Sequence, residues 1–435
     1  MPDAAAAAIA ELQARGRFGT QLGLGRTRAL LRLLGHPERR LRGALIGGTN
    51  GKGSVQAMVG AVLAAAGSRA GQTPKPHLVD YRERIVVGGQ AIAPDDLAEV
   101  LGEVLRAADR VPSSLGSPTE FELLTAAAFT WFARRGVDVA VVEVGLGGRL
   151  DATNAWDGGV AVITNVELDH MDRLGGTLAR IGFEKAAIIK RGDRAVTGAS
   201  GAGLAAVRRR AARFDVPLAE VSTLPVTAMD LDGLVVQAPH LPDLRVGLLG
   251  RHQAANAAVA LATLHALDAA GIASVDEAAV RRGLAAVRWP GRLEVLPGDP
   301  QVLLDGAHNE AGVAALAAAL QELRPLLAPG RPTLLFGVMA DKAVERMVSR
   351  LVAAPALRDA QVVATAASGT RALPAAALAT TWRGLAGSTV EVRSIPDARA
   401  ALAHAQGLAR AAGGPLIVAG SLYLVGAVRG WLVAR

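Results

Sequence analysis

The chain has 435 residues, more than one hydrophobic core usually organises, so two domains are expected. It contains no cysteine, which excludes disulfides and thiol catalysis and fits a reducing cytoplasm, and it has no run of about 18 apolar residues that would predict a membrane span. The net charge of +8 is carried largely by arginine and aromatic residues are only 3%, which is typical of a solvated basic surface and gives no support to a nucleic-acid interface.

A glycine-rich stretch near the start of the chain is the strongest local signal. It lies between the apolar run 44–46 and a helical pattern of apolar residues, so it joins a strand to a helix. Glycines let backbone N–H groups point inward, a lysine supplies a mobile positive charge, and a hydroxyl can reach a magnesium ion. The predicted phosphate-binding residues are Gly48, Thr49, Asn50, Gly51, Lys52, Gly53 and Ser54.

The match to the general phosphate-loop pattern is imperfect. Ile46 stands where its first glycine belongs, and Gly53 separates the lysine from the serine. A glycine-rich turn without a ligand is therefore the alternative interpretation.

The elements that follow predict a mainly parallel sheet. Residues 84–92 are typical of a hairpin, and helices are expected from Pro94 and from Ser117, where Pro118 takes the first helical position. Strands at 137–144 and 160–164 are nearly all apolar, as strands covered on both faces are. Short strand-like pieces from about 195 to 247 predict a small antiparallel addition. Helices return at 253–269 and at 275–287, the latter opened by Ser274.

A break at 289–292 marks the predicted domain boundary. Beyond it, strands near 301–305, 333–337, 361–365, 390–393 and 415–419 alternate with helices. The predicted fold is α/β throughout. A phosphate-loop domain with a mainly parallel sheet and a small antiparallel addition is expected over 1–290, and a smaller Rossmann-like α/β domain over 291–435.

Charged residues at predicted strand ends are candidates for chemistry. Glu143 ends a strand where a parallel sheet presents its ligand-binding edge, so it could hold magnesium; a helix cap or a salt bridge is the alternative. His170 closes another strand segment, and Lys185 lies in an expected helix. Alone, such a histidine is more often structural and such a lysine is usually solvated.

The second domain offers a further group of candidates. Arg292 could contact a terminal phosphate and Asp305 could accept from a ribose hydroxyl, if the two domains fold toward each other. Turn and helix-cap chemistry is the alternative for Asp305 and Asn309.

Together these segments resemble one family, the folylpolyglutamate and dihydrofolate synthases of the Mur ligase superfamily. The resemblance runs in order along essentially the whole chain, and the twelve residues 143–154 are its most specific part. The matching segments are 48–54, 76–78, 143–154, 163–165 with 168–170, 184–186, 252–253 with 256–257, 305–309 and 420–426.

The resemblance implies an ATP-dependent amide ligase. In such enzymes a substrate carboxylate attacks the γ-phosphate of ATP, and the amino group of glutamate then displaces phosphate from the acyl phosphate. It further implies that the substrates are dihydropteroate or a folate, L-glutamate and ATP. Apart from the resemblance, we expect a cytoplasmic protein that binds neither nucleic acid nor membrane, with a monomer as the default.

The resemblance also assigns roles to single residues. Lys52, His170, Lys185 and His308 would be catalytic, and Asn256, Arg292 and Asp305 would join the phosphate loop in binding ATP. Two Mg²⁺ ions are implied, one at Ser54 and Glu143 and a second at His170 and a carbamylated Lys185. The acid substrate would lie near His77 and Phe121, and glutamate near His308 and Ser421.

Three departures from the family pattern stand out. Lys75 replaces the usual serine before Pro-His-Leu, Ala187 replaces a usual glycine, and Gly25 replaces a usual acidic residue. Only Lys75 touches the expected substrate loop, so it bears on substrate details. Two alternatives stay open: a Mur-type ligase for another carboxylic acid, and a phosphate-loop nucleotide switch that does not ligate.

Overall fold

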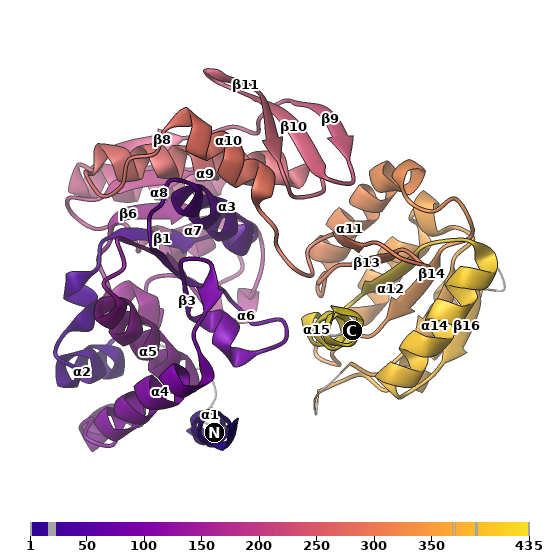
Figure 1. Ribbon diagram of the computed structural model, residues 1–435, viewed down its shortest axis with the longest axis horizontal. Helices are drawn as coiled ribbons and strands as arrows, with labels where there is room; N and C mark the ends of the chain where they lie inside the picture. The colour runs from indigo at the N-terminus through magenta and orange to yellow at the C-terminus, as the bar shows by residue number, and fades with distance from the viewer. Residues whose placement is uncertain (1, 16–22, 368, 370, 388–389, 434–435) are drawn as a thin grey trace. The chain divides into compact units, whose positions relative to one another are not determined.

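The computed structural model describes residues 2–15, 23–367, 369, 371–387 and 390–433, and the chain forms two compact units (Figure 1). The first unit comprises Met1–Pro225, Val236–Val246 and Gln253–Val287, and the second comprises Val226–Val235, Gly247–His252 and Arg288–Arg435. The domain limits 1–290 and 291–435 remain a prediction. The second compact unit also includes two short segments, Val226–Val235 and Gly247–His252, that come before this limit in the chain. In the described part of the chain, no helix combines the length and the apolar character needed to cross a bilayer.

The first unit is built on an eight-stranded sheet. Its strands are β1 (Gly43–Gly47), β2 (Ala70–Thr73), β3 (Val86–Val87), β4 (Gln90–Ala91), β5 (Val139–Glu143), β6 (Gly159–Ile163), β7 (Arg194–Thr197) and β8 (Leu218–Glu220). They lie in the order β4-β3-β2-β5-β1-β6-β7-β8, and all pairs are parallel except those that β3 makes. Because β1 lies between β5 and β6, the carboxyl ends of these three strands meet at one edge.

Helices cover both faces of this sheet. On β2, Gln72 Nε2 donates to the carbonyl of Gln56 in α3 at 3.1 Å. The preceding strand residue, Gly71, packs directly against Phe132 in α5. Since neighbouring strand residues point to opposite faces, α3 and α5 lie on opposite sides. The helices of this unit are α1 (Pro2–Arg15), α2 (Gly25–Leu33), α3 (Lys52–Ala65), α4 (Pro94–Ala108), α5 (Glu120–Arg135), α6 (Met171–Leu174), α7 (Leu178–Ala186), α8 (Gly201–Phe214), α9 (His252–Ala269) and α10 (Glu277–Ala286).

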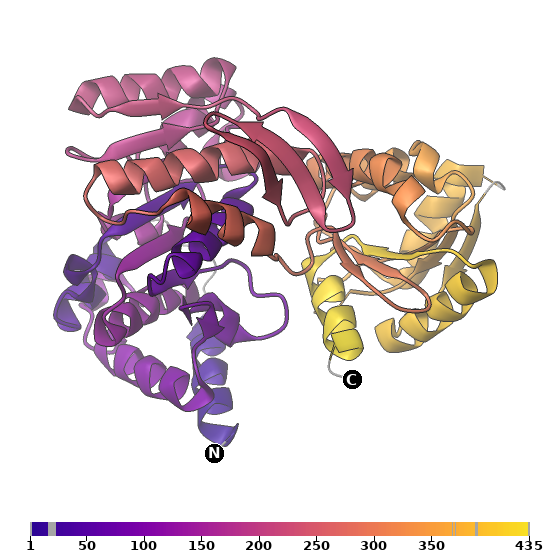
Figure 2. The same cartoon turned by 45° about the horizontal axis from the view of Figure 1, so that its top comes forward.

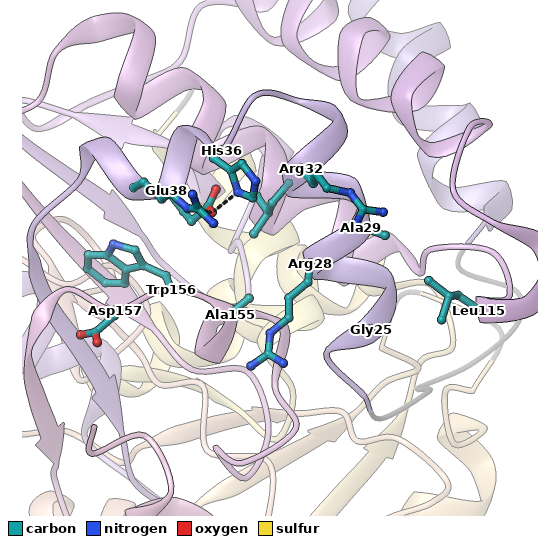
Figure 3. Close-up of a pocket in the computed structure, with 12 residues that line it drawn as sticks. Gly25, Arg28, Ala29, Arg32, His36, Glu38, Leu115, Ala155, Trp156 and Asp157 are labelled. Carbon is teal, nitrogen blue, oxygen red and sulfur yellow. Dashed lines mark hydrogen bonds and ion pairs between the residues drawn. The ribbon is translucent and has the colours of Figure 1, made fainter. Parts of the chain in front are cut away.

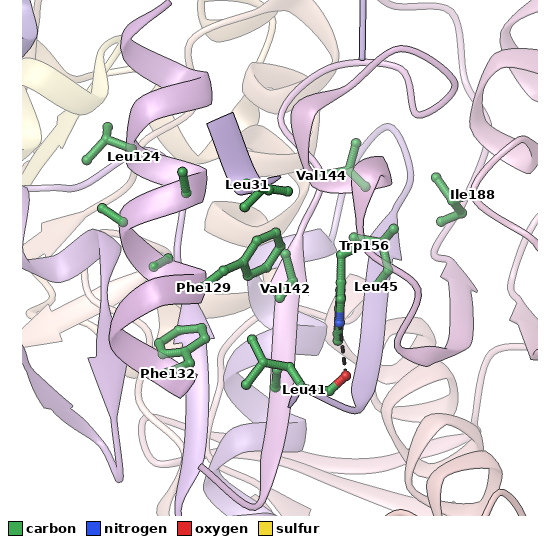
Figure 4. Packing of buried hydrophobic residues seen from close by; sticks show 14 of the residues in the cluster. Leu31, Leu41, Leu45, Leu124, Phe129, Phe132, Val142, Val144, Trp156 and Ile188 are labelled. Atoms are coloured by element: carbon green, nitrogen blue, oxygen red, sulfur yellow. Dashed lines mark hydrogen bonds between the residues drawn. The ribbon is translucent and has the colours of Figure 1, made fainter. Parts of the chain in front are cut away.

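The core on the α5 face explains why this helix is apolar. Phe129 and Phe132 are fully buried, and the Phe129 ring lies 5.7 Å from the Trp156 ring (Figure 4). Burial of such side chains contributes about 1.5–3 kcal/mol each. Trp156 also donates its indole N–H to the carbonyl of Leu41 at 3.1 Å, which ties the core to the segment entering β1.

The antiparallel addition is shorter than the sequence predicts. Strands β7 and β8 are parallel members of the main sheet, separated by α8, so the expectation of an antiparallel addition from 195 was wrong for this part. β8 lies at the sheet edge and is mostly exposed, so it lacks the apolar run that marks a parallel strand. Only β9 (Val226–Asp230), β10 (Gly233–Ala238) and β11 (Leu241–Val246) form the separate sheet, with two-residue connections that require antiparallel neighbours.

Two helix starts also differ from the prediction. Thr119, not Ser117, caps α5, because its side chain accepts from the N–H of Glu122 and the Glu122 carboxylate accepts from Thr119 N. Asp276, not Ser274, caps α10, because its side chain accepts from the N–H of Ala279. In both cases a second capping residue lies two positions later, and spacing alone does not separate the two candidates.

The second unit contains a six-stranded sheet between helices. The order is β12-β13-β17-β14-β15-β16, parallel except for β12, whose strand the sequence analysis did not find. Its strands are β12 (Glu294–Leu296), β13 (Val302–Leu304), β14 (Thr333–Phe336), β15 (Gln361–Ala364), β16 (Glu391–Ser394) and β17 (Leu416–Ala419).

The helices of this unit form two layers. They are α11 (Glu310–Leu323), α12 (Val344–Val352), α13 (Ala375–Ala386), α14 (Ala398–Ala412) and α15 (Leu422–Val433). The first three pack in a row, and α14 packs with α15 (Figure 2). The core of the second unit contains the buried pair Phe336 and Trp382, with ring centroids 5.9 Å apart. The predicted α/β class, with a mainly parallel first sheet and a second sheet domain, is confirmed.

Candidate active site

The glycine-rich stretch forms the predicted loop between β1 and α3. Gly48 and Gly51 have φ values of 144° and 79°, which favour glycine. Side chains here would also collide with neighbours: a Cβ would lie 1.8 Å from Thr164 Oγ1 at Gly48, and 2.2 Å from Asn256 Oδ1 at Gly51. The loop therefore needs glycine for both conformation and space.

The residues that follow β6 hold this loop in place. The Asn165 side-chain oxygen accepts from the N–H groups of Thr49 (3.1 Å) and Asn50 (2.9 Å), and Thr164 Oγ1 donates to the carbonyl of Asn50 at 2.6 Å. Glu167 accepts from the Asn50 side chain at 2.8 Å. Sequence analysis gave these residues no such role, although their position after the strand beside β1 was a usable signal. Because two loop N–H groups are engaged here, those at the start of α3 are better placed to meet an anion.

Two lysines converge on the same loop carbonyl. Lys52 Nζ donates to the carbonyls of Gly48 (3.1 Å) and Thr49 (2.9 Å), and Lys185 Nζ, from α7, donates to Gly48 at 2.8 Å. Lys185 is buried. Its burial, reinforced by the Lys52 charge, lowers the pKa of Lys185 to about 7.

Glu143 lies beside the loop at the end of β5, in register with Ile46 of β1. It is 4% exposed; its N–H donates to Thr73 Oγ1 at 3.1 Å, and its carboxylate accepts from Lys75 N at 3.2 Å. Lys75 Nζ donates to the Glu143 carbonyl and lies 4.4 Å from the centre of the Phe121 ring. Burial lowers the pKa of Lys75 to about 8, although Asp151 and Glu143 act in the opposite direction.

The segment after Glu143 is organised by one carboxylate. Asp151 accepts from the N–H groups of Gly145 and Leu146 at 3.0 and 2.9 Å, and from both N–H and hydroxyl of Thr153. Phe121 packs so closely on Gly145 that a Cβ there would lie 2.7 Å from its ring. This network accounts physically for Gly145 and the aspartate of the 143–154 motif.

His170 is placed differently from the other predicted residues. Its backbone is left-handed, with φ of 47°, its side chain is 52% exposed, and its ring lies 3.7 Å from the Asp169 carboxylate. Among the residues that the structure describes, no three His, Cys, Asp or Glu side chains cluster in a way that could hold a metal ion.

Of the predicted acid-substrate residues, Phe121 lies beside Lys75 and His77 lies beside Arg84 and Tyr81. His77 Nδ1 accepts from Arg84 Nε at 2.8 Å, and its ring lies 4.3 Å from that of Tyr81. Burial, with Arg84 beside it, lowers the pKa of His77 to about 4, so the imidazole is neutral.

Among the predicted ATP-binding residues, Asn256 of α9 is also buried. Its side chain donates to Gln253 at 2.8 Å, and its oxygen faces Gly51.

In the second unit, the predicted residues gather at the carboxyl ends of β13 and β17, which are neighbours. Asp305 is buried and accepts from the N–H groups of Leu293 and Ala307, both at 2.9 Å, while Arg292 lies against Gly306. Burial raises the pKa of Asp305, against the opposing effect of Arg292. His308 Nδ1 lies 2.8 Å from the Gly306 carbonyl, and buried Ser421 accepts from Tyr423 N at 3.2 Å.

The turn interpretation explains part of this group. Asn309 caps α11 by accepting from Gly312 N at 2.7 Å. Asp305 fixes the turn into α11 as well, so its local contacts are structural.

One pocket of about 630 Å³ lies elsewhere on the first unit, lined by residues of α2, the turn at 36–39 and the segment 155–157 (Figure 3). His36 Nδ1 lies 2.9 Å from the Glu38 carboxylate inside it. None of the predicted site residues lines this pocket. The candidate site is therefore the loop region at the carboxyl ends of β1, β5 and β6.

Comparison with known proteins gives two matches along the chain. Residues 46–264 match the Mur ligase middle domain, and residues 291–422 match the Mur ligase glutamate ligase domain. The dihydrofolate synthase/folylpolyglutamate synthase of Bacillus subtilis is 36% identical over 78% of this chain and 81% of its own length. The folylpolyglutamate synthase of Lacticaseibacillus casei is 35% identical over 92% of each. The chain belongs to the folylpolyglutamate and dihydrofolate synthase family.

The solved structures agree with this membership. A folylpolyglutamate synthase from Mycobacterium tuberculosis, complexed with ADP and AMPPCP, superimposes with a TM-score of 0.87 at 34% identity, over 99% of both chains. The family resemblance drawn from the sequence motifs is thus confirmed. In this member of the family, the glycine loop, Lys52, Lys185, Glu143 and Asn256 are brought together within the first unit, while Arg292, Asp305, His308 and Ser421 gather within the second.

Proposed function

We propose that this chain is an ATP-dependent ligase that joins L-glutamate to dihydropteroate or to a reduced folate. The observation that carries the proposal is the glycine loop with two lysines on one carbonyl and Glu143 beside it, in a chain that also contains a glutamate ligase domain. The presence of the glutamate ligase domain argues against a nucleotide switch that does not ligate. Relatives named for folate substrates speak against a ligase for an unrelated acid.

The reaction follows from the groups that the loop provides. An oxygen of the substrate carboxylate attacks the γ-phosphorus and ADP leaves; the glutamate nitrogen then attacks the acyl carbon, phosphate leaves, and the nitrogen loses a proton. Lys52 and the N–H groups at the start of α3 would neutralise the phosphates. Asn256, Arg292 and Asp305 would hold the rest of ATP, His77 and Phe121 the acid, and His308 and Ser421 glutamate.

A magnesium ion fits one part of this site. Ser54 lies in the first turn of α3 and Glu143 ends the neighbouring strand, and both are buried. Mg²⁺ commonly takes one or two protein oxygens and completes its shell with phosphate and water, so a single carboxylate suffices. When bound, it would neutralise charge on the transferred phosphate.

The second ion rests on a modification. We propose that Lys185 carries a carbamate, which would turn a cation into an anionic oxygen ligand beside His170. Its lowered pKa supports this, because the neutral amine is the form that adds to carbon dioxide.

Cytoplasmic location and a monomeric state also remain predictions. Cell fractionation checks the first, and size-exclusion chromatography with light scattering checks the second.

The decisive experiment is release of phosphate from ATP with dihydropteroate or tetrahydrofolate as the acid. Release should require both the acid and glutamate at millimolar magnesium, and the glutamylated product should be detected by mass. A panel of other carboxylic acids tests the alternative ligase. No turnover with either folate-type substrate would refute the proposal.

A further inference from the structure

Lys75 places a positive charge where the site is expected to bind a metal. Its backbone N–H donates to the Glu143 carboxylate at 3.2 Å, and its ammonium group donates to the carbonyl of the same residue. The side chain as a whole is partly exposed, but its ammonium end is enclosed, with the Phe121 ring 4.4 Å away. The lysine is therefore held against Glu143 at both of its ends.

The carboxylates around this ammonium are not equivalent. Asp151 is committed to the 145–153 segment, because its oxygens accept from Gly145, Leu146 and Thr153. Glu143 is the residue to which Lys75 is bonded directly. The positive charge of Lys75 is attracted most by Asp151 and next by Glu143. It therefore also acts on the end of β5, at the edge that the glycine loop shares.

We propose that the positive charge of the Lys75 ammonium opposes the binding of a divalent cation at Glu143, so that this site binds magnesium more weakly than it would with a neutral residue at position 75. The inference rests on the proposed function, in which Glu143 helps to hold the metal. A fixed unit charge close to a divalent ion is unfavourable in a poorly solvated site, where screening by water is small. The negative phosphates of the nucleotide must then supply most of the metal affinity.

A purely structural role for Lys75 predicts something different. If the lysine only anchors the 73–78 loop through hydrogen bonds, its removal should loosen the loop and weaken metal binding. If its charge competes with the metal, removal should tighten metal binding. The sign of the change separates the two.

The test measures binding of Mn²⁺, a paramagnetic substitute for Mg²⁺, to the full chain with saturating ADP, by electron paramagnetic resonance. Lys75→Met removes the charge and keeps most of the side-chain volume, and Lys75→Arg retains the charge. Lys190→Met is a matched control, because Lys190 is a second enclosed lysine of the same unit, whose ammonium group donates to the carbonyl of Ile188 at 3.2 Å.

Lys75→Met should bind Mn²⁺ on the order of tenfold more tightly than the wild type. Lys75→Arg and Lys190→Met should stay within about twofold of the wild type, on the same reasoning about charge. Equal or weaker binding in Lys75→Met overturns the inference, as does the absence of Mn²⁺ binding in both proteins.

Folding and function are controlled separately. Circular dichroism and thermal melts establish that each variant is folded, and Lys75→Ser replaces Lys75→Met if the methionine variant does not fold. Glutamate-dependent phosphate release by the wild type tests the proposed function independently. Turnover without a change of metal affinity in the variants would therefore leave the function standing and remove the role of Lys75.

Discussion

Lys185 shows how burial changes the chemistry of an ordinary side chain. As a residue in an expected helix it is indistinguishable from a solvated lysine, but the fold buries it against Gly48 and beside Lys52. The loss of hydration favours its neutral form, so its pKa falls to about 7. The reactivity of the Lys185 amine therefore follows from its buried position in the fold.

Replacement of Lys185 by alanine should abolish ligation, and short carboxylic acids such as acetate should restore part of it, because they return an anionic oxygen to the vacated space. Phosphate release with and without acetate measures the effect. Lys190→Ala, which alters another enclosed lysine, should show no dependence on acetate. Undiminished activity in Lys185→Ala would contradict the carbamate.

Lys52→Ala should lower kcat/KM by on the order of a thousandfold while leaving the fold intact, since its ammonium group donates to the carbonyls of the loop itself, Gly48 and Thr49. Steady-state phosphate release and circular dichroism check both parts. Lys342→Ala, whose lysine pairs with Asp341 in the second unit, serves as the control. Near-normal turnover in Lys52→Ala would remove the loop lysine from the mechanism.

Asp193 predicts a pH dependence of stability that is independent of the site. Burial, with Asp157 beside it, raises the pKa of Asp193 to about 7. Between about pH 4 and 7 the folded chain therefore binds a proton that the unfolded chain has released, so the free energy of unfolding falls as the pH rises through this window.

In Asp193→Asn this fall should shrink by about 2 kcal/mol, because the amide does not titrate. Urea unfolding at pH 4.5, 6 and 8 measures it. Asp172→Asn, at an exposed aspartate, should follow the wild type. Parallel pH profiles for Asp193→Asn and the wild type would show that the shift is absent.

At the scale of one element, α3 offers two glycines in the same conformation with different surroundings. Gly51 precedes the helix with φ of 79° and faces Asn256, whereas Gly67 follows it with φ of 81° and has open space around it. A comparison of alanine substitutions at these two glycines therefore separates the effect of backbone strain from the effect of steric contact.

Gly67→Ala should cost about 1 kcal/mol of stability through strain alone and leave ADP affinity unchanged. Gly51→Ala should cost more and should weaken ADP binding at least tenfold, because the methyl group displaces Asn256 from the loop. Urea unfolding and calorimetric titration with ADP give the comparison. Equal ADP affinities in the two variants would show that the contact between Gly51 and Asn256 does not matter for the nucleotide.

At the scale of the whole molecule, two separate hydrophobic cores predict two unfolding events. One core packs against the sheet of the first unit and the other contains Phe336 and Trp382. ADP with magnesium at about a hundred times its dissociation constant should stabilise the unit with the glycine loop by about 2.7 kcal/mol, which raises its melting temperature by about 5–10 °C. Scanning calorimetry measures this shift. A nucleotide that moves neither transition would contradict binding at the loop.

Much of this organisation is encoded locally. The apolar strands, the glycine loop, the helix that follows it and the alternation of strands and helices after residue 300 appear in the structure near their predicted positions, because burial on both faces and backbone conformation leave direct marks on residue type. Capping positions and the exposed edge strand β8 were misplaced, since several polar residues satisfy the same spacing and an edge strand needs no apolar run.

The sequence by itself determined the family and supplied the residues of the candidate site, since glycine, lysine and carboxylate at these spacings suit phosphate chemistry. Only the tertiary structure decided which of them meet. It joined Lys52 and Lys185 at one carbonyl, engaged the loop N–H groups with Asn165, left His170 half exposed, and placed the Lys75 ammonium against Glu143. These outcomes depend on contacts between residues far apart in the chain, and on the burial that sets their charge.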